Sequence, residues 1–517
     1  MTLGTDAWRL ARLPYWGLAV LTTLVAPRAA QAEDTGPGAA RLQTSLVWIW
    51  GDDDVLHAPA DRTPPSPSSG IGDRPGYDAL YEGFSSRYTG RESRSELRLN
   101  GEAPGLMTGL TTRAGLALGL ELGSLTARST PLLVADLGSF VELEWTLGQP
   151  RGGRSDSVTL RLLPLNGDRE RVGELEALAW GGAVGPHWES PYASAPGAVR
   201  AGQLELALGF TRAHAGVKTA RFLEAQPAGP AVEETSYGVY GGVESRWSAP
   251  IRVALAFGHF EHGRLPGPAG SPRATTTGVS LRLAAGAGLE RPRAPVAFMN
   301  DGSPFDHWPA VAKGFVLGVE AAHLVQRLWD ADTPGVSVLA PARALALLGE
   351  LSSRALDLRA AFVVRDASFV MRNGLGVLPA QTISRDAAER PELAALASLG
   401  LVALPRVVPS LSVGVLWPAA VTFGAVDSLG QPVGATLVVR GPGDVEALPP
   451  EETPVPVFDV RPGLELRLSP LLEVVAWLGY RRDFNRTRFV ATPQGTLGLG
   501  FQSPEQLGYG LAARAVW

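Results

Sequence analysis

The sequence predicts an all-β protein, a transmembrane antiparallel β-barrel of about 18 strands, within a range of about 16–20. Apolar and polar residues alternate along one segment after another, and this period of two is the signature of strands with two different faces. We expect many of the strands to extend to ten or more residues, which is longer than a typical soluble strand and suits the ~9–11 residues of a tilted membrane strand. A closed barrel is the sheet that satisfies every backbone group in lipid.

The N-terminus has the pattern of a secretory signal peptide. Arg9 and Arg12 precede an apolar run from Trp16 to Ala26, and residues 30–32 form a small-x-small cleavage site. About 11 apolar residues are too few for a helix that spans ~30 Å of hydrocarbon. The sequence contains no cysteine, so disulfides and a lipoprotein anchor are excluded and the exported chain depends on backbone pairing and packing.

Composition narrows the classes of protein that fit the remaining chain. We expect residues 1–32 to be removed and residues 33–517 to form one barrel. The net charge of −5 argues against a nucleic-acid partner. The most apolar stretch, Leu393–Val415, is interrupted by two prolines and an arginine, so a helical membrane protein is excluded. Its first part, Leu393–Leu404, is apolar on both faces, which leaves strand and helix open there.

The predicted strands follow one another along the chain, beginning with residues 42–50, where Leu42, Leu46, Trp48 and Trp50 share a face. Each later segment places leucine, valine or aromatic residues on one face and glutamate, arginine, glycine or alanine on the other. These segments are 116–122, 141–147, 158–162, 204–210, 279–287, 314–320, 356–362 and 464–468. Aromatic residues near segment ends suit interfacial girdles, namely Trp48, Trp50, Trp145, Trp247, Trp417, Phe501 and Trp517.

The last eleven residues alternate in the same way and end on an aromatic residue. Leu507, Tyr509, Leu511, Ala513, Ala515 and Trp517 share one face. This ending resembles the closing strand of Gram-negative outer-membrane β-barrels of the porin-like and alginate-export-like kinds. The resemblance implies an outer-membrane location and a C-terminal insertion signal, read by the barrel insertion machinery. The residues of that signal would be Tyr509, Leu511, Ala513, Ala515 and Trp517.

Connections between the predicted strands should alternate between long and short, because an even number of strands returns both termini to the periplasmic side. Residues 51–91 form a polar stretch rich in proline, serine, glycine and aspartate, and we expect this stretch to be the first extracellular loop. Further long loops are expected at Asn300–Trp308, Asp366–Glu392, Val426–Gly434 and Gly441–Pro454.

Charged residues on the faces opposite the apolar ones are candidates for the lining of a pore. They are Glu121, Glu142, Glu144, Arg161, Glu205, Arg282, Glu320, Asp357, Arg359, Glu465, Arg467 and Arg514. Mixed charges inside a barrel line a wet channel or pair across strands as structure, and both alternatives stay open. We expect Arg282, Arg359 and Arg467, set against Glu144, Glu205 and Glu320, to govern ion selectivity.

The leading function hypothesis is a channel or exporter for hydrophilic solutes or a polysaccharide. The alternatives are a non-conducting outer-membrane anchor in a surface-motility or export assembly, with periplasmic partners, and a soluble secreted β-protein. No catalytic or cofactor signature is present. Metal sites at Asp52–Asp54 and around Asn300–His307 lack ligand spacing, and His259 and His262 fall on opposite faces of a strand. We therefore expect neither enzymatic activity nor a cofactor.

Overall fold

A computed structural model describes most of the predicted barrel. The described residues are 41–52, 56, 92–104, 107–122, 132–136, 138–151, 154–165, 172–175, 178–181, 200–224, 232–248, 250–265, 271–288, 313–372, 381–404, 406–424, 434–441, 444–491 and 497–517. The predicted signal peptide, nearly all of the first predicted loop and the segment Asn300–Trp308 lie outside these residues.

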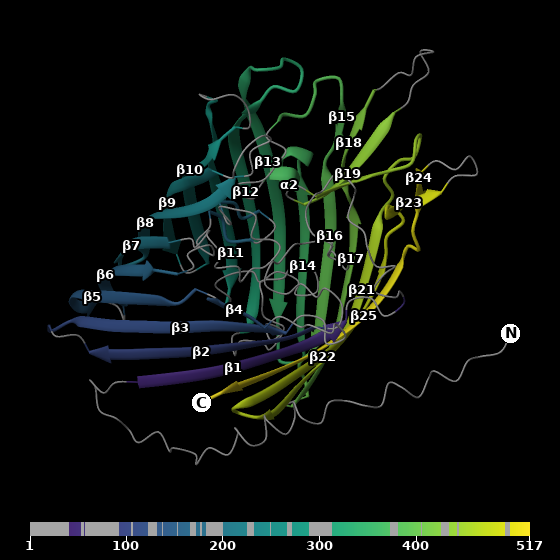
Figure 1. The fold of residues 1–517 in the computed structure, drawn as a ribbon. Coiled ribbons are helices and arrows are strands. Elements are labelled where there is room, and N and C mark those ends of the chain that lie inside the picture. The colour runs from purple at the N-terminus through teal and green to yellow at the C-terminus, as the bar shows by residue number, and fades with distance from the viewer. Residues whose placement is uncertain are drawn as a thin grey trace.

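The main sheet is antiparallel throughout and closed on itself (Figure 1). Strand β1 (Arg41–Asp52) pairs with β2 (Glu92–Pro104) on one side and with β25 (Glu505–Val516) on the other. Strands β4 (Leu132–Asp136) and β5 (Phe140–Arg151) pair in succession with β3 (Leu110–Leu122) and together make one stave. The barrel therefore has 18 staves, which confirms the predicted fold class.

The remaining staves follow in chain order. They are β6 (Arg154–Leu163), β7 (Arg200–Leu208), β8 (Thr211–Glu224), β9 (Val232–Ser248), β10 (Ile251–Arg264), β11 (Arg273–Ala287), β12 (Gly314–Trp329), β13 (Ser337–Ser352), β14 (Leu356–Arg365), β16 (Glu392–Leu401), β17 (Val407–Trp417), β21 (Val457–Ser469) and β22 (Leu472–Arg482). Strand β16 covers most of the ambiguous run Leu393–Leu404, so that run is a strand; it pairs with β14 and β17.

The two rims of the barrel differ in the length of their connections. At the rim that holds Trp517, here the terminal rim, β7 joins β8, β9 joins β10, and β21 joins β22 through two-residue connections. At the opposite rim, the loop rim, β14–β16, β17–β21 and β22–β25 are joined by long connections with small elements of their own. The connection 288–313 between β11 and β12 is a long one that starts and ends at the terminal rim. The expected loop at Asn300–Trp308 lies outside the described residues, and the two ends of its connection are at the terminal rim because strand direction, not loop composition, decides the side.

Small elements stand above the loop rim (Figure 1). Helix α2 (Ala367–Arg372) and strand β15 (Ala388–Arg390) belong to one connection, and β18 (Ala419–Phe423), β19 (Ala435–Gly441) and β20 (Asp444–Ala447) belong to the next. Strands β15, β18, β19 and β20 form one four-stranded sheet, and β23 (Thr487–Ala491) pairs with β24 (Leu497–Phe501). The loops expected at Val426–Gly434 and Gly441–Pro454 are therefore two parts of one connection that contains this sheet.

Four glycines on the inner wall lie directly opposite an aromatic residue of the neighbouring strand. The pairs are Gly115 with Phe140, Gly216 with Tyr240, Gly238 with Phe260, and Gly510 with Trp477. In each pair a Cβ on the glycine would run into the aromatic ring. The glycine leaves space for the ring to lie over the strand, a device that supports curvature and register in barrels.

Candidate functional site

The outer surface of the barrel carries an apolar belt. On β12 the side chains of Phe315, Leu317 and Val319 are 51%, 63% and 38% exposed, whereas their neighbours Val316 and Glu320 are buried. The same alternation continues on β11, β13 and β14. A contiguous apolar surface of this extent is foreign to soluble monomers and is satisfied by lipid.

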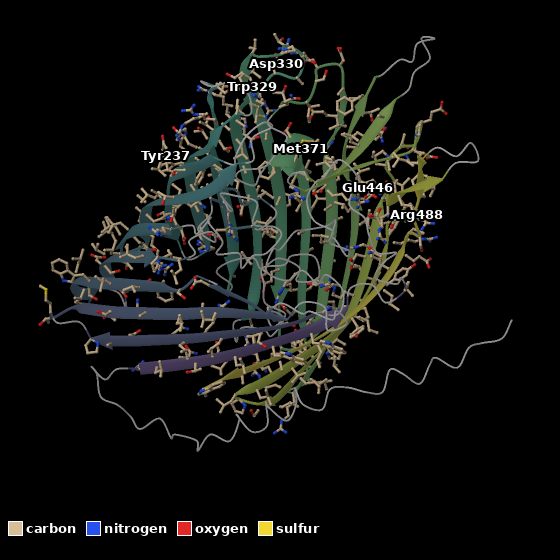
Figure 2. All side chains as sticks on the ribbon, viewed as in Figure 1. Tyr237, Trp329, Asp330, Met371, Glu446 and Arg488 are labelled. Atoms are coloured by element: carbon tan, nitrogen blue, oxygen red, sulfur yellow. The ribbon has the colours of Figure 1, made fainter. Side chains whose placement is uncertain are left out.

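Aromatic residues border this belt at both rims. Those of the loop rim are Trp50, Tyr237, Trp329, Trp417, Tyr480 and Tyr509, and those of the terminal rim are Trp145, Phe210, Phe315 and Trp517. Trp50 and Tyr509 pack edge to face across β1 and β25, with ring centroids 5.1 Å apart. Tyr237 and Trp329 lie on the side of the loop rim in Figure 2. Two aromatic girdles around an apolar band are the outer surface of a barrel in the bacterial outer membrane.

The chain is an integral outer-membrane β-barrel. Its closed ladder leaves no unpaired edge in lipid. Barrels of this class carry short periplasmic turns and long external loops, so the loop rim corresponds to the cell surface. In the described part of the chain, no helix is long and apolar enough to cross a membrane.

The inner wall of β2, β3, β5 and β6 carries a row of alternating charges. Arg113 Nε lies 3.0 Å from Glu102 Oε2, and Arg113 Nη1 lies 2.9 Å from Glu142 Oε1. Arg161 Nη2 lies 2.7 Å from the other oxygen of Glu142, and Glu144 also pairs with Arg113. Direct cross-strand neighbours of opposite charge stabilise a sheet, so this row is both structural and polar toward the interior.

A second charged row lies near the terminal rim on β21, β22 and β25. Glu473 stands between Arg467, at 3.2 Å, and Arg514, whose Nε is 3.1 Å from Glu473 Oε2. Further along the same strands Arg481 binds Asp459 at 2.7 Å. The charges of this wall are therefore paired with one another rather than gathered into one region of single sign.

Part of the connection between β6 and β7 folds into the barrel. Residues 172–175 and 178–181, here the inward segment, pack against the inner wall and are closed by a two-way backbone bridge between Val172 and Trp180. Gly173 and Gly181 have φ values of +99° and +73°, which favour glycine. A Cβ on Gly173 would also lie 3.1 Å from Glu320 Oε1. The two glycines thus allow the tight course of the segment against the wall.

Charged groups of the wall hold the inward segment. The Glu174 carboxylate pairs with Arg252, at 3.2 Å, and with Arg282. Glu320 accepts hydrogen bonds from the backbone N–H of Glu174, at 2.9 Å, and of Leu175, at 3.1 Å. Each charged group is buried or half-buried and is paired, as low-dielectric surroundings require.

Two further contacts hold the end of the inward segment. The Trp180 indole N–H donates to Ser280 Oγ at 3.1 Å, and Lys218 Nζ donates to the Gly181 carbonyl. The Trp180 ring packs edge to face on Phe260, with centroids 5.6 Å apart. The segment is therefore attached to β8, β10, β11 and β12.

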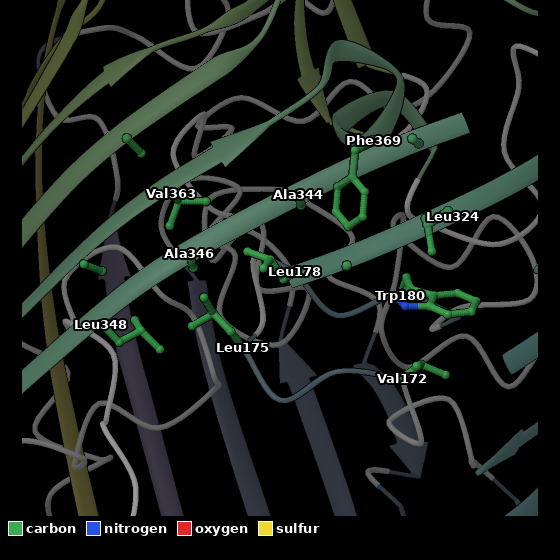
Figure 3. Packing of buried hydrophobic residues seen from close by; sticks show 14 of the residues in the cluster. Val172, Leu175, Leu178, Trp180, Leu324, Ala344, Ala346, Leu348, Val363 and Phe369 are labelled. Carbon is green, nitrogen blue, oxygen red and sulfur yellow. The ribbon is translucent and has the colours of Figure 1, made fainter. Parts of the chain in front are cut away.

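An apolar cluster inside the barrel completes this attachment (Figure 3). Leu175 and Leu178 of the segment are 5% and 0% exposed and pack with the inner faces of β12, β13 and β14. The wall residues of the cluster include Leu324, Ala342, Ala344, Ala346, Leu348, Ala361 and Val363, and Phe369 of α2 also belongs to it. The inward segment thus packs on apolar side chains of β12, β13 and β14 as well as on charged groups of the wall.

The candidate lining residues occupy the strands and faces as follows. On positions opposite the apolar belt lie Glu142, Glu144, Arg161, Glu205, Arg282, Glu320, Asp357, Arg359, Glu465, Arg467 and Arg514. Glu121 is placed by its backbone register opposite Arg94, on the same face. The structure brings Arg282 and Glu320 together as direct neighbours and joins Arg359 to Asp357 at 2.8 Å.

Several other charged residues of the interior were not among those predicted from the sequence. Arg113 and Arg252 could have been found by extending the alternation of their strands toward their ends. Glu473 could have been found in the same way. Glu174 carried no such signal, because it lies in a connection whose inward fold depends on contacts with β10, β11 and β12.

In the described residues, no group of three or more His, Asp or Glu side chains could hold a metal ion. His259 bonds Thr277 Oγ1 at 2.7 Å on the outer face. The residues Asp53 and Asp54, and the segment around Asn300–His307, lie outside the described part of the chain.

No protein-family model matches the chain, and no curated protein matches it. Among solved structures, the chain is similar to three Pseudomonas aeruginosa proteins. OpdK, crystallised with vanillate, has a TM-score of 0.42 at 10% identity over 92% of this chain and 99% of that chain. OccK8 (OprE) has a TM-score of 0.44 at 9% identity over 92% of this chain and 98% of that chain. OpdQ has a TM-score of 0.43 at 8% identity, with the same two coverages. Similarity at this level supports no inference about substrate, and the assignment as an outer-membrane barrel depends on the closed register and the outer belt.

Proposed function

We propose that the barrel is a channel for small hydrophilic solutes, narrowed by the inward segment. The observation that carries this proposal is the attachment of residues 172–175 and 178–181 to the inner wall by Glu174 and Glu320. A barrel of 18 strands without such a filling encloses space for water. A segment fixed inside that space narrows the path of a solute and places carboxylates, guanidiniums and backbone groups along it.

The charge pattern favours small polar solutes over a single class of ion. Arg113, Arg161 and Arg467 each have a carboxylate partner within 3.2 Å, so the fields of the two signs largely cancel along these rows. A narrowed path is also less suited to a polysaccharide than to a small solute. The choice among solutes would then depend on the size of the solute and on its hydrogen bonding near the inward segment.

Planar-bilayer recording of the purified barrel tests the proposal. We expect discrete conductance steps from the unaltered protein. Glu320→Gln removes the charged acceptor of two segment N–H groups and should give larger or noisier steps, because charge-assisted hydrogen bonds worth about 1.5–3 kcal/mol each are weakened. Glu473→Gln removes an equal charge far from the segment and is the matched control. Folded protein that never conducts would contradict the channel and favour the non-conducting anchor.

The C-terminal strand supports a second, separate proposal about assembly. Tyr509, Leu511, Ala513 and Trp517 lie on the lipid-facing side of β25, and the Trp517 backbone exchanges two hydrogen bonds with Thr44 of β1. We propose that this strand is the insertion signal read by the barrel insertion machinery. Slower appearance of heat-modifiable protein for Trp517→Ala in growing cells would support it, and unchanged assembly would contradict it.

A further inference from the structure

Three exposed basic side chains lie on the outer face of β12 and β13, toward the loop rim. His323 and Arg327 are four residues apart on β12 and point to the same side as Phe315. Arg343 lies directly opposite His323 on β13, and all three are exposed. On β12, His323 and Arg327 follow the apolar positions Phe315, Leu317 and Val319 toward the loop rim. Arg327 stands two residues before Trp329 of the loop-rim girdle, which Figure 2 labels.

Within the described residues no ion pair joins this basic patch to a carboxylate, although Asp366 follows β14 at the position opposite Arg343. The outward neighbours of Arg327 and His323 on β11 are Thr275 and Val279, which carry no charge. The nearest acidic group by register is Asp366, just beyond β14, whose N–H donates to the carbonyl of Arg343. Within the described residues, the side chains of Arg327 and Arg343 form neither an ion pair nor a hydrogen bond. The next acid along the rim, Glu261, is already paired with Arg273 at 2.7 Å.

We propose that Arg327, Arg343 and His323 bind the phosphate groups of a lipid headgroup in the outer leaflet. Arginine on a lipid-facing strand is costly at mid-membrane and is tolerated near an interface. At the level of the girdle it meets headgroups rather than acyl chains, and phosphate is the anion that a guanidinium binds in bidentate fashion. The patch is therefore a lipid-binding surface on the outside of the barrel, separate from the solute path.

The experiment measures lipid binding to the purified full-length barrel in neutral detergent. The probe is diphosphorylated lipid A, and the comparison lipid is the same molecule with both phosphates removed. Arg327→Gln combined with Arg343→Gln should weaken lipid A binding about 25-fold, at about fivefold for each guanidinium near an anionic lipid surface. Native mass spectrometry reports the bound lipid, and heat-modifiability confirms that each variant is folded.

A matched control lies at the other rim of the same strands. Lys313, just before β12, and Arg354, in the turn between β13 and β14, are exposed cations on the terminal rim. Lys313→Gln combined with Arg354→Gln should leave lipid A binding unchanged. The proposal is overturned if the loop-rim variant binds as the unaltered protein does, or if both variants weaken equally. Equal binding of the dephosphorylated lipid, or complete displacement by millimolar inorganic phosphate, would overturn it as well.

Discussion

At the scale of single residues, most charged side chains described inside the barrel form ion pairs with one another. Inside the barrel, Glu174 lies between Arg252 and Arg282, and its carboxylate is the contact that joins the inward segment to β10 and β11. Removing one member of such a set leaves the others in low-dielectric surroundings without a partner, which costs more than the pair itself contributes. The consequences should appear both in selectivity and in the attachment of the segment.

Glu174→Gln should shift the selectivity of the channel toward anions, because two buried guanidiniums lose a shared counter-charge. It should also weaken the attachment of the segment by about 1.5–3 kcal/mol, the usual contribution of a charge-assisted hydrogen bond. Reversal potentials in a salt gradient measure the first effect, and conductance measures the second. Glu473→Gln, which removes an inward charge near the terminal rim and away from the segment, should leave the conductance unchanged. A variant at Glu174 with unaltered reversal potential and conductance would contradict the proposed role.

A second residue-scale network fastens the small sheet above the loop rim. Arg440 pairs with Glu446 of β20 and lies 2.6 Å from Asp483, which also accepts bonds from the N–H and side chain of Asn485. Burial raises the pKa of Glu446 despite its arginine partner. Burial also acts to raise the pKa of Asp483, but Arg440 and Asn485 outweigh it and the pKa is lowered. Asp483 is therefore the carboxylate that holds Arg440.

The pKa directions predict how this fastening responds to acid. The Asp483 carboxylate has a lowered pKa, so it stabilises the fold at pH values above its ordinary pKa of 3.8. That contribution is lost as the pH falls through the lowered pKa. Glu446, with a raised pKa, is protonated first and without loss of the Asp483 pair. We expect hydrogen exchange of residues 435–441 and 444–447 to stay slow down to about pH 4. Asp483→Asn should raise the rate of hydrogen exchange of these residues about 10-fold or more at pH 7, and Glu446→Gln should raise that rate less. The reverse order would contradict this assignment.

At the scale of the element, the strands owe their shape to glycine and aromatic pairs across neighbouring strands. Phe260 on β10 lies over Gly238 of β9 and also contacts Gly181 of the inward segment, so one ring joins wall and segment. Glycine at position 238 is required by the close approach of the Phe260 ring rather than by an unusual backbone angle.

Gly238→Ala should therefore destabilise the barrel, because the new methyl group meets the Phe260 ring. Overpacking of this kind costs about 1–3 kcal/mol. Gly400→Ala on β16 is the control, since its nearest neighbour would be a Val408 methyl group at 3.5 Å, an ordinary contact. Urea titration of folded barrel in lipid vesicles measures both. Equal stability of the two variants would show that the ring moves aside without cost.

At the scale of the whole molecule, lipid covers the outer belt and water or protein covers the inner wall. An arginine on the outer surface should therefore destabilise the barrel strongly at the middle of the membrane and only weakly near a rim. Leu281→Arg, opposite Leu255 and Ala321 in the middle of the belt, should cost about 2–4 kcal/mol, and Ile251→Arg at the terminal rim about 0–1 kcal/mol. Folding equilibria in lipid vesicles measure the difference. Equal costs would place the membrane elsewhere on the barrel.

The sequence by itself determined the class of fold, the approximate number of strands and the outward face of each strand. Alternation such as Phe315, Leu317 and Val319 against Glu320 is local, because successive side chains of a strand point to opposite sides whatever the rest of the chain does. The same rule assigned Arg282, Arg467 and most other candidate residues to the face opposite the belt before any contact was known.

Only the tertiary structure decided what the inward residues meet. Glu174 bonds to Arg252 across 78 positions of sequence, and its segment turns inward because β10, β11 and β12 present matching groups. The side of each connection was also decided globally, since the rim of residues 288–313 depends on counting every strand before it. Long-range pairing of this kind leaves no periodic trace in the sequence, and for that reason the inward face of these residues could be predicted and their partners could not.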